Sequence, residues 1–149
     1  MRLTPSSFPL ADLRPVPFPQ SGATVVIHTA SPIHGLGQAI YEKVNITGTR
    51  TVIATCIQNG IKKLVFTSSA GVVFSGTEEV VDVDERLDFP AIPMDAYNET
   101  KARAEALVLG ANGRDGLMTC ALRPAGIFGS VRASRLPLLS AFVRTNPRR

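Results

Sequence analysis

The sequence predicts an α/β protein, and three observations support this. From residue 23 onward, short β-branched segments alternate with longer helical segments. The first of these segments, residues 24–30, is apolar on both faces, which is typical of strands in a parallel sheet that helices cover on each side. A chain of 149 residues with 44% hydrophobic and 19% charged residues is suited to one globular domain with a buried core. The order strand, helix, strand, helix, strand predicts right-handed crossovers and a parallel sheet.

The two ends of the chain differ in composition from the middle. Residues 1–22 contain five prolines, which remove backbone donors and block strand pairing, so this leader is expected to be irregular. Residues 23–130 form the expected α/β domain. Residues 131–149 form a basic tail with five arginines and no acidic residue. We favour a solvated tail over a nucleic-acid surface, since no aromatic residues alternate with these arginines.

Helical spacing follows the first strand. A helix is expected over residues 44–58, and Asn59-Gly60 is a typical C-terminal signal for it. Residues 63–68 then read as the second strand of the sheet. In the loop after it, residues 80–83 could form a short edge strand.

A second helix is expected over residues 96–109, because Asp95 is a good N-terminal cap for it and Asn112-Gly113 ends it. The third strand is expected over residues 117–122, and Arg123-Pro124 closes it. Together these elements make a sheet of three parallel strands.

Two cysteines, Cys56 and Cys120, lie far apart within apolar segments. They are expected to be buried thiols of a reducing compartment, with no disulfide, and the sequence predicts no metal site. No apolar segment reaches the ~18 residues of a membrane span, and the first residues lack a signal-peptide pattern. The sequence therefore indicates a protein that is not secreted.

The chemistry-bearing residues are Tyr97 and Lys101, with a serine, Ser68 or Ser69, at the end of the second strand. Tyr97 and Lys101 are four residues apart and so share one helix face. A cation about 4 Å away, at an effective dielectric of ~20, can supply the roughly 4 kcal/mol that lowers a tyrosine pKa from ~10 to about 7. A serine can orient a substrate oxygen beside such a base. The trio predicts proton transfer to or from an alcohol or carbonyl, which requires a hydride carrier.

The order of segments around this trio resembles the extended short-chain dehydrogenases, in particular the 3β-hydroxysteroid dehydrogenase family. Within it, the resemblance is nearest to the fungal decarboxylating branch that acts on sterol 4α-carboxylates. The motifs include Asp95-Ala96-Tyr97-Asn98-Glu99-Thr100-Lys101 and Leu122-Arg123-Pro124-Ala125-Gly126. The segments that carry the match are residues 25–32, 44–49, 65–74, 95–102 and 122–129.

The resemblance implies that residues 23–130 form part of a Rossmann-like, doubly wound dinucleotide-binding and catalytic domain that lacks its first strands and glycine loop. It also implies a role for each of several residues. Tyr97 would be the proton acceptor, Ser69 would hold the substrate oxygen, and Lys101 would lower the Tyr97 pKa and bind the nicotinamide ribose. The resemblance also implies that residues after two strands line the cofactor, NAD or NADP: Ala30, Ser31, Pro124 and Ala125. It further implies a sterol substrate, sterol biosynthesis, and peripheral association with the endoplasmic reticulum membrane. A cytoplasmic location is the alternative.

The family's first strands and glycine loop find no counterpart here, so the chain is expected to be truncated at both ends. Gly35 and Gly37 follow a strand, but Ile40 stands where the dinucleotide fingerprint needs a third glycine. Strand 24–30 corresponds to the family's fourth strand, and without a neighbour it leaves an apolar edge that favours self-association.

Two other functions stay open on the sequence. The chain could be a non-catalytic remnant that pairs through its open edge, or a dehydrogenase or epimerase acting on another alcohol or a nucleotide sugar. Two histidines are not expected to act: His28 as a packed core residue and His34 on a loop surface. The acidic residues before Tyr97 are expected to form a solvated loop.

Overall fold

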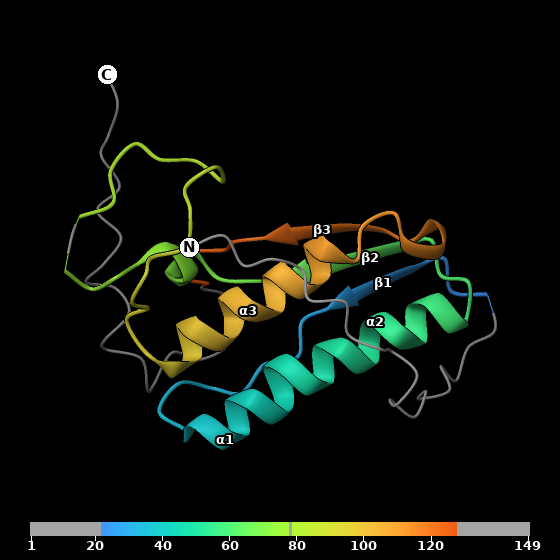
Figure 1. Cartoon of the computed structure of the whole chain (residues 1–149), viewed down its shortest axis with the longest axis horizontal. Coiled ribbons are helices and arrows are strands. Elements are labelled where there is room, and N and C mark those ends of the chain that lie inside the picture. The colour runs from blue at the N-terminus through green and yellow to red at the C-terminus, as the bar shows by residue number, and fades with distance from the viewer. Residues whose placement is uncertain (1–21, 78, 128–149) are drawn as a thin grey trace.

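The computed structural model describes residues 22–77 and 79–127 of the chain. The proline-rich leader, up to residue 21, and the basic tail therefore lie outside the described residues. The described part is an α/β fold, as the sequence predicts. Its parallel sheet contains β1 (Val25–His28), β2 (Lys63–Thr67) and β3 (Met118–Leu122) in the order β1-β2-β3 (Figure 1).

The register of the sheet fixes which side chains share a face. Ile27 pairs with Val65 and Val65 pairs with Cys120, so these three side chains point to the same side. All three strands run parallel, and each is linked to the next by a helical crossover. Their carboxyl ends therefore meet at one edge of the sheet.

The first crossover is a nearly continuous helix that is longer than the sequence predicts. It comprises α1 (Gln38–Tyr41), a π-helical segment η2 (Glu42–Gly48) and α2 (Thr49–Gln58). The prediction of a start at residue 44 was wrong, because residues 38–40 are exposed and give no apolar periodicity to read. The predicted end is confirmed: Gly60 has φ +66° and the Ile61 amide donates to the Cys56 carbonyl at 2.9 Å, as in a Schellman cap.

The second crossover carries α3 (Ala96–Gly110), and Asp95 caps it as predicted, accepting a hydrogen bond from the Asn98 amide at 2.7 Å. Two short 3₁₀ segments, η3 (Ala70–Val73) and η4 (Arg114–Gly116), flank it in sequence. The predicted edge strand at residues 80–83 is wrong. Asp82 has φ +50° there, which interrupts an extended segment, and the neighbouring valines line a pocket instead.

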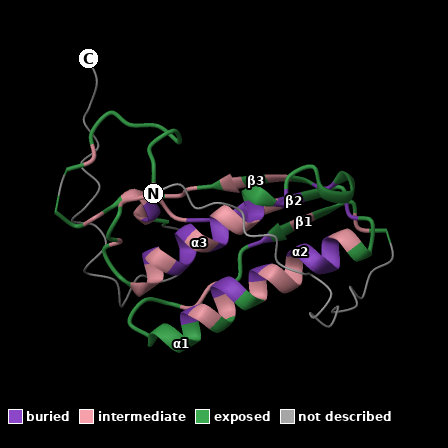
Figure 2. Ribbon diagram, viewed as in Figure 1, coloured by how far each residue is buried: buried purple, intermediate pink, exposed green. Residues whose placement is uncertain are grey.

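Both α2 and α3 pack on one face of the sheet (Figure 1). Two right-handed crossovers that step across a sheet in the same direction place their helices on the same side. The core lies between this face and the helices (Figure 2), and its buried residues are Ile46, Ile53, Cys56, Ile61, Leu64, Phe66, Ala104, Val108, Ala111 and Leu117.

The other face of the sheet is open in the part of the chain that the structure describes. Ile27 is 66% exposed, and Met118 and Leu122 are more than half exposed. The expectation of helices on both faces is therefore wrong for this part. The same geometry corrects one cysteine: Cys56 is buried, as predicted, whereas Cys120 is exposed because β3 directs it to the open face.

Candidate active site

The candidate site lies at the carboxyl edge of the sheet, where the first turns of α3 approach the strand ends. Ser31 follows β1, Ser69 follows β2 and Pro124 follows β3. In open α/β sheets, ligands bind at this edge because strand ends and helix N-termini converge there. The fold thus brings together segments that are up to 93 residues apart, the separation of Ser31 and Pro124.

Tyr97 lies at the centre of this site, and the structure brings the predicted serine to it. The hydroxyls of Ser31 and Ser69 lie near enough to the phenol to lower its pKa. Ser69 is itself oriented by the Gly71 amide, which donates to its Oγ at 3.1 Å. Ser31, which the resemblance assigns to the cofactor, donates through its Oγ to Asn45 Oδ1 at 3.1 Å.

The pKa of Tyr97 lies above its ordinary value of 10.0, mainly because the phenol is partly buried. The hydroxyls of Ser31 and Ser69 lower it, whereas Asp95 and Tyr41 raise it. The expectation that Lys101 lowers the Tyr97 pKa is wrong for this structure, because the ammonium is directed elsewhere. Lys101 Nζ donates to the Thr67 carbonyl at 2.5 Å and lies 4.3 Å from the centre of the Phe66 ring.

Lys101 is 1% exposed, and burial lowers its pKa to about 8, while the Glu105 carboxylate acts in the opposite direction. His28 packs nearby, bonded to Thr49 Oγ1 at 3.0 Å, and its pKa is lowered by burial and by Lys101. The prediction of a packed histidine at His28 is confirmed. Lys101 is therefore a buried cation that pins α3 to the end of β2.

Aromatic rings cover the tyrosine. The His34 and Tyr97 ring centres are 3.8 Å apart, and Tyr41 contacts Tyr97 edge-on at 5.8 Å. Tyr41 also holds the loop that carries His34, because its hydroxyl donates to the Ile33 carbonyl and accepts from the Leu36 amide, each at 3.0 Å. His34 is exposed, as predicted, but its contact with Tyr97 was missed because the sequence gives no sign of this loop's fold.

Asn45 is a second contact that sequence reasoning missed. It is 1% exposed in the π-helical segment η2, accepts from Ser31 Oγ at 3.1 Å and donates to Thr100 Oγ1 at 3.1 Å. Its amide thereby connects the crossover helix, the end of β1 and α3. A π-helical turn rotates residues relative to an α-helix and is frequent at functional sites. Sequence periodicity could not reveal this turn.

Behind Lys101 lies a buried ion pair between α3 and β3. Arg123 Nη2 donates to Glu105 Oε1 at 2.8 Å, and the two side chains are 14% and 2% exposed. The other carboxylate oxygen, Oε2, accepts from Ser68 Oγ at 2.5 Å. The spacing of Tyr97, Lys101 and Glu105 at steps of four could have suggested a common helix face.

The remaining predicted cofactor residues lie at the same edge. Ala30 and Ala125 are exposed, and Pro124 is half-buried with its carbonyl accepting from the Ala70 amide at 2.9 Å. Ala30, Pro124 and Ala125 thus present small, apolar side chains at this edge, whereas Lys101 is buried with its Nζ on the Thr67 carbonyl. The Gly35–Gly37 turn leads into the start of α1 and holds no third glycine.

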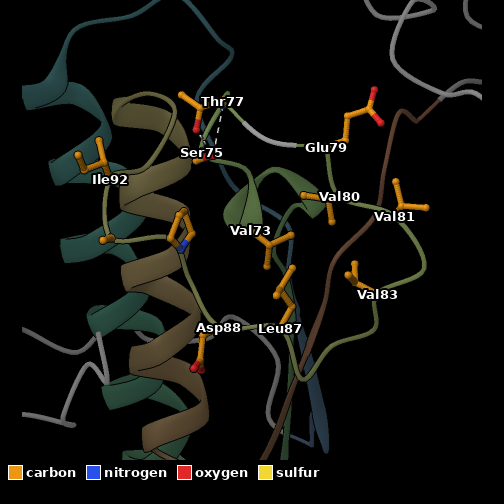
Figure 3. A pocket seen from close by; sticks show the side chains of 12 residues that line it. Val73, Ser75, Thr77, Glu79, Val80, Val81, Val83, Leu87, Asp88 and Ile92 are labelled. Carbon is orange, nitrogen blue, oxygen red and sulfur yellow. Dashed lines mark hydrogen bonds between the residues drawn. The ribbon is translucent and has the colours of Figure 1, made fainter.

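A pocket of about 490 Å³ lies between η3 and the loop that precedes α3. Eight of its twelve lining residues are apolar, and Figure 3 shows Val73 from η3 next to Leu87 from the loop. Four polar residues complete the lining. Val73, the last residue of η3, is the lining residue nearest in sequence to Ser69.

Three further features of the described residues concern metal binding, membrane spans and the acidic loop. Residues 22–77 and 79–127 contain no group of three His, Cys, Asp or Glu side chains arranged to hold a metal ion. In the same ranges, no helix has the length and apolar character needed to cross a bilayer. Asp84 forms an exposed ion pair with Arg86 at 2.6 Å, in keeping with the solvated acidic loop that the sequence predicts.

Solved structures share this fold. A short-chain dehydrogenase/reductase superfamily protein from Agrobacterium tumefaciens with bound NAD matches with a TM-score of 0.59 and 28% identity over 68% of this chain and 31% of that one. The UDP-glucose 4-epimerase of Thermus thermophilus, in complex with NAD, gives a TM-score of 0.60 and 26% identity over 68% and 33%. Fold and site together define a Rossmann-like domain of the short-chain dehydrogenase/reductase class.

Sequence comparison narrows this class to one family. A sequence model of the 3-beta hydroxysteroid dehydrogenase/isomerase family matches residues 16–148, and the chain belongs to that family. It is 50% identical over 122 residues to the sterol-4-alpha-carboxylate 3-dehydrogenase, decarboxylating, of Candida albicans, and 55% identical over 111 residues to that of Saccharomyces cerevisiae. These matches cover 82% and 74% of this chain but 35% and 32% of the relatives, so the chain spans about a third of their length.

Proposed function

We propose that this chain carries the catalytic centre of an NAD(P)-dependent dehydrogenase that oxidises the 3-hydroxyl of a sterol 4-carboxylate in sterol biosynthesis. The convergence of Tyr97, Ser69 and Ser31 at the carboxyl edge of the sheet carries the proposal. The names of the fungal relatives, which are half identical over most of this chain, support the substrate class. The NAD complexes of the similar folds support the cofactor.

In this proposal each side chain has one task. Ser69 Oγ holds the substrate oxygen, and the Tyr97 phenolate accepts the hydroxyl proton. Lys101 places its positive charge under the site. Ala30, Ser31, Pro124 and Ala125 would border the dinucleotide, which supplies the hydride acceptor for the hydrogen on carbon 3. Because burial keeps the Tyr97 pKa high, we expect the rate to increase with pH as more of the phenol ionises.

Oxidation at carbon 3 prepares the loss of the neighbouring carboxylate. The product is a 3-keto-4-carboxylate, in which the bond to the carboxyl carbon breaks, carbon dioxide leaves and the electron pair passes to the ketone oxygen as an enolate. Protonation at carbon 4 then completes the ketone. The word "decarboxylating" in the names of the relatives matches this sequence of steps.

The apolar pocket beside η3 has a place in the same proposal. A sterol is almost entirely hydrocarbon, and pockets of roughly 300–1,000 Å³ are typical for small ligands. The pocket of about 490 Å³, with its valine and leucine lining, would take part of this hydrocarbon. Since sterols reside in bilayers, we also propose that the protein works at the endoplasmic reticulum surface.

Titration of the purified chain with NADH tests the proposal, with thermal shift and tyrosine fluorescence as readouts. Saturable binding below millimolar NADH supports it, and its absence favours a non-catalytic chain. A 4-carboxysterol and a UDP-hexose, offered with NAD⁺ and NADP⁺, separate the sterol dehydrogenase from an enzyme acting on nucleotide sugars.

The Tyr97→Phe variant tests the proton acceptor. It removes the hydroxyl that accepts the proton but keeps the ring that contacts His34 and Tyr41. We expect turnover to fall at least ~100-fold, as for loss of a general base, while NADH affinity stays within about twofold. Turnover equal to that of the unmodified chain would refute the role of Tyr97.

A further inference from the structure

One face of α3 holds the end of β2 through three successive turns. Lys101 donates to the Thr67 carbonyl at 2.5 Å, and Glu105 accepts from Ser68 Oγ at 2.5 Å. The next residue, Ser69, lies near enough to the Tyr97 phenol to lower its pKa. Steps of four residues keep the three helix side chains on one face. The three residues after Phe66 are thus each tied to a different turn of the same helix.

Glu105 is the least expected of these three side chains of α3. Its side chain is 2% exposed, and an isolated carboxylate at that depth would be strongly destabilising. Here every carboxylate oxygen has partners: Oε1 accepts from Arg123 Nη2 at 2.8 Å and from Nε at 3.0 Å, and Oε2 accepts from Ser68. The carboxylate therefore joins α3, the end of β2 and the end of β3 at one point.

Arg123 extends the connection to the loop before α3. Its Nη1 donates to the Glu85 carbonyl at 3.4 Å, and its guanidinium carbon lies 5.4 Å from the centre of the Phe89 ring. Neighbouring Leu87 and Asp88 line the apolar pocket. The ion pair is thus the contact common to the strand that presents Ser69, the helix that presents Tyr97 and the loop that borders the pocket.

We propose that Glu105 and Arg123 are positioning residues of the active site: their buried ion pair holds Ser68, and through it Ser69, against the face of α3 that carries Tyr97 and Lys101. The catalytic part of this inference rests on the proposed function, whereas the positional part concerns this chain alone. Neither residue needs to touch substrate or cofactor. A buried ion pair often adds little to stability compared with apolar packing. A positional role therefore explains the presence of this pair better than a stabilising role does.

The positional role predicts changes that a merely stabilising ion pair would not cause. The Ser69 hydroxyl lowers the pKa of Tyr97, and the Glu105 charge raises the pKa of Lys101. Displacing Ser69 should therefore raise the Tyr97 pKa, and removing the Glu105 charge should lower the Lys101 pKa below about 8. The other titratable groups around them, His28, Tyr41 and Asp95, stay in place in these variants.

The chain is well suited to this measurement, since it contains two tyrosines and four lysines. The probes are ¹³C-labelled tyrosine and lysine side chains, titrated by NMR in the unmodified chain, Ser68→Ala, Glu105→Gln and Arg123→Lys. Ser68→Ala breaks only the link between the ion pair and the strand end. Arg103→Gln is the matched control, because Arg103 lies on the same helix, α3, but pairs with Glu42 of η2 and Glu99 of α3 rather than with Glu105.

We expect Ser68→Ala to raise the Tyr97 pKa and Glu105→Gln to lower the Lys101 pKa, with no change in Arg103→Gln. If turnover is measurable, Ser68→Ala should lose on the order of tenfold in kcat at unchanged NADH affinity. A folded Ser68→Ala chain with the Tyr97 titration of the unmodified chain would overturn the proposal. So would a folded Glu105→Gln chain with an unchanged Lys101 titration.

Glu105→Gln leaves Arg123 without its anion and could prevent folding. In that case the double variant Glu105→Gln/Arg123→Met removes both charges, and the same Lys101 titration decides the question. These readouts do not depend on cofactor binding. A chain that fails to bind NADH yet shows both pKa shifts refutes the proposed function and supports the positioning role. A chain that binds NADH but shows neither pKa shift supports the proposed function and refutes the positioning role.

Discussion

Lys101 illustrates at the scale of a single residue how a functional side chain can oppose stability. Burial lowers its pKa from 10.5 to about 8, a difference equivalent to about 3 kcal/mol. At neutral pH the lysine is protonated in both the folded and the unfolded chain, and the folded chain bears the cost of the buried charge. Between pH 8 and 10.5 the folded chain releases this proton first, so this destabilisation diminishes as pH rises.

We therefore predict that Lys101→Met raises the free energy of unfolding at pH 7 by on the order of 1 kcal/mol, since loss of the bond to the Thr67 carbonyl offsets part of the gain. The advantage over the unmodified chain should shrink between pH 8 and 10. Urea denaturation across this range measures both effects. Lys43→Met, at an exposed position of η2, is the control and should show no such pH dependence. A Lys101→Met chain that is less stable at pH 7 would contradict the prediction.

The sequence predicted which side chains gather at the site better than it predicted their contacts. Tyr97 was found from helix spacing, which is a local signal. A strand end indicated a serine beside it, and the family resemblance singled out Ser69. The direction of Lys101 depends instead on the Thr67 carbonyl and on Phe66, which lie 34 and 35 residues away in sequence. The partners of Asn45 and Arg123 are equally non-local, and no local pattern encodes them.

At the scale of elements, the close approach of η3 to α3 depends on Gly71. A Cβ at this position would overlap Asn98 Oδ1 and lie 3.2 Å from Asn98 Cγ. Asn98 is 2% exposed and has little room to move. The absence of a side chain at Gly71 thus allows the segment after Ser69 to pack on the first turn of α3.

We predict that Gly71→Ala lowers the free energy of unfolding by about 1–3 kcal/mol, the usual effect of forcing extra volume into a packed site. It should also disturb the Gly71 bond to Ser69 and hence raise the Tyr97 pKa. Gly48→Ala provides a control of opposite sign: its backbone is helical, the nearest atom is 3.8 Å away, and alanine should stabilise by about 0.5–1 kcal/mol. Thermal denaturation of the two variants should move in opposite directions, and a stabilised Gly71→Ala would be inconsistent with this packing.

Element boundaries show where local sequence signals fail. Residues 38–40 are exposed and gave no helical signal, yet they continue the helix because the next residue, Tyr41, anchors them with a buried ring and two hydrogen bonds. Residues 80–83 have the composition of a strand but find no ladder partner. The caps at Asp95 and Gly60 were predicted because capping depends on residues next to the helix end.

At the scale of the whole molecule, the sheet has one covered and one open face among the described residues. One cysteine lies in the core beneath the covered face, and the other lies on the open face. Cys56 is 0% exposed, and burial raises its pKa to about 11, whereas Cys120 lies on the open face. We predict that a thiol reagent modifies Cys120 rapidly in the native chain and modifies Cys56 only after unfolding. Counting reacted thiols before and after urea, with Cys120→Ser as control, measures this. Protection of Cys120 in the native chain would mean that this face is covered in solution.

One side of β1 is unpaired in the sheet that the described residues form. In the described sheet β1 is an edge strand, and Val25 and Ile27 are 43% and 66% exposed. An exposed apolar edge offers unpaired backbone groups and hydrocarbon to a second chain.

We therefore expect the chain to self-associate as its concentration rises, and Ile27→Lys to keep it monomeric to higher concentration, because a lysine on an edge strand resists both strand pairing and apolar contact. Leu109→Lys is the matched control, since Leu109 is also partly exposed, at 46%, but lies near the end of α3. Sedimentation velocity over a concentration series distinguishes the variants. Equal association of Ile27→Lys and Leu109→Lys would place the contact elsewhere than β1, whereas a monomeric unmodified chain would show that its edge is protected.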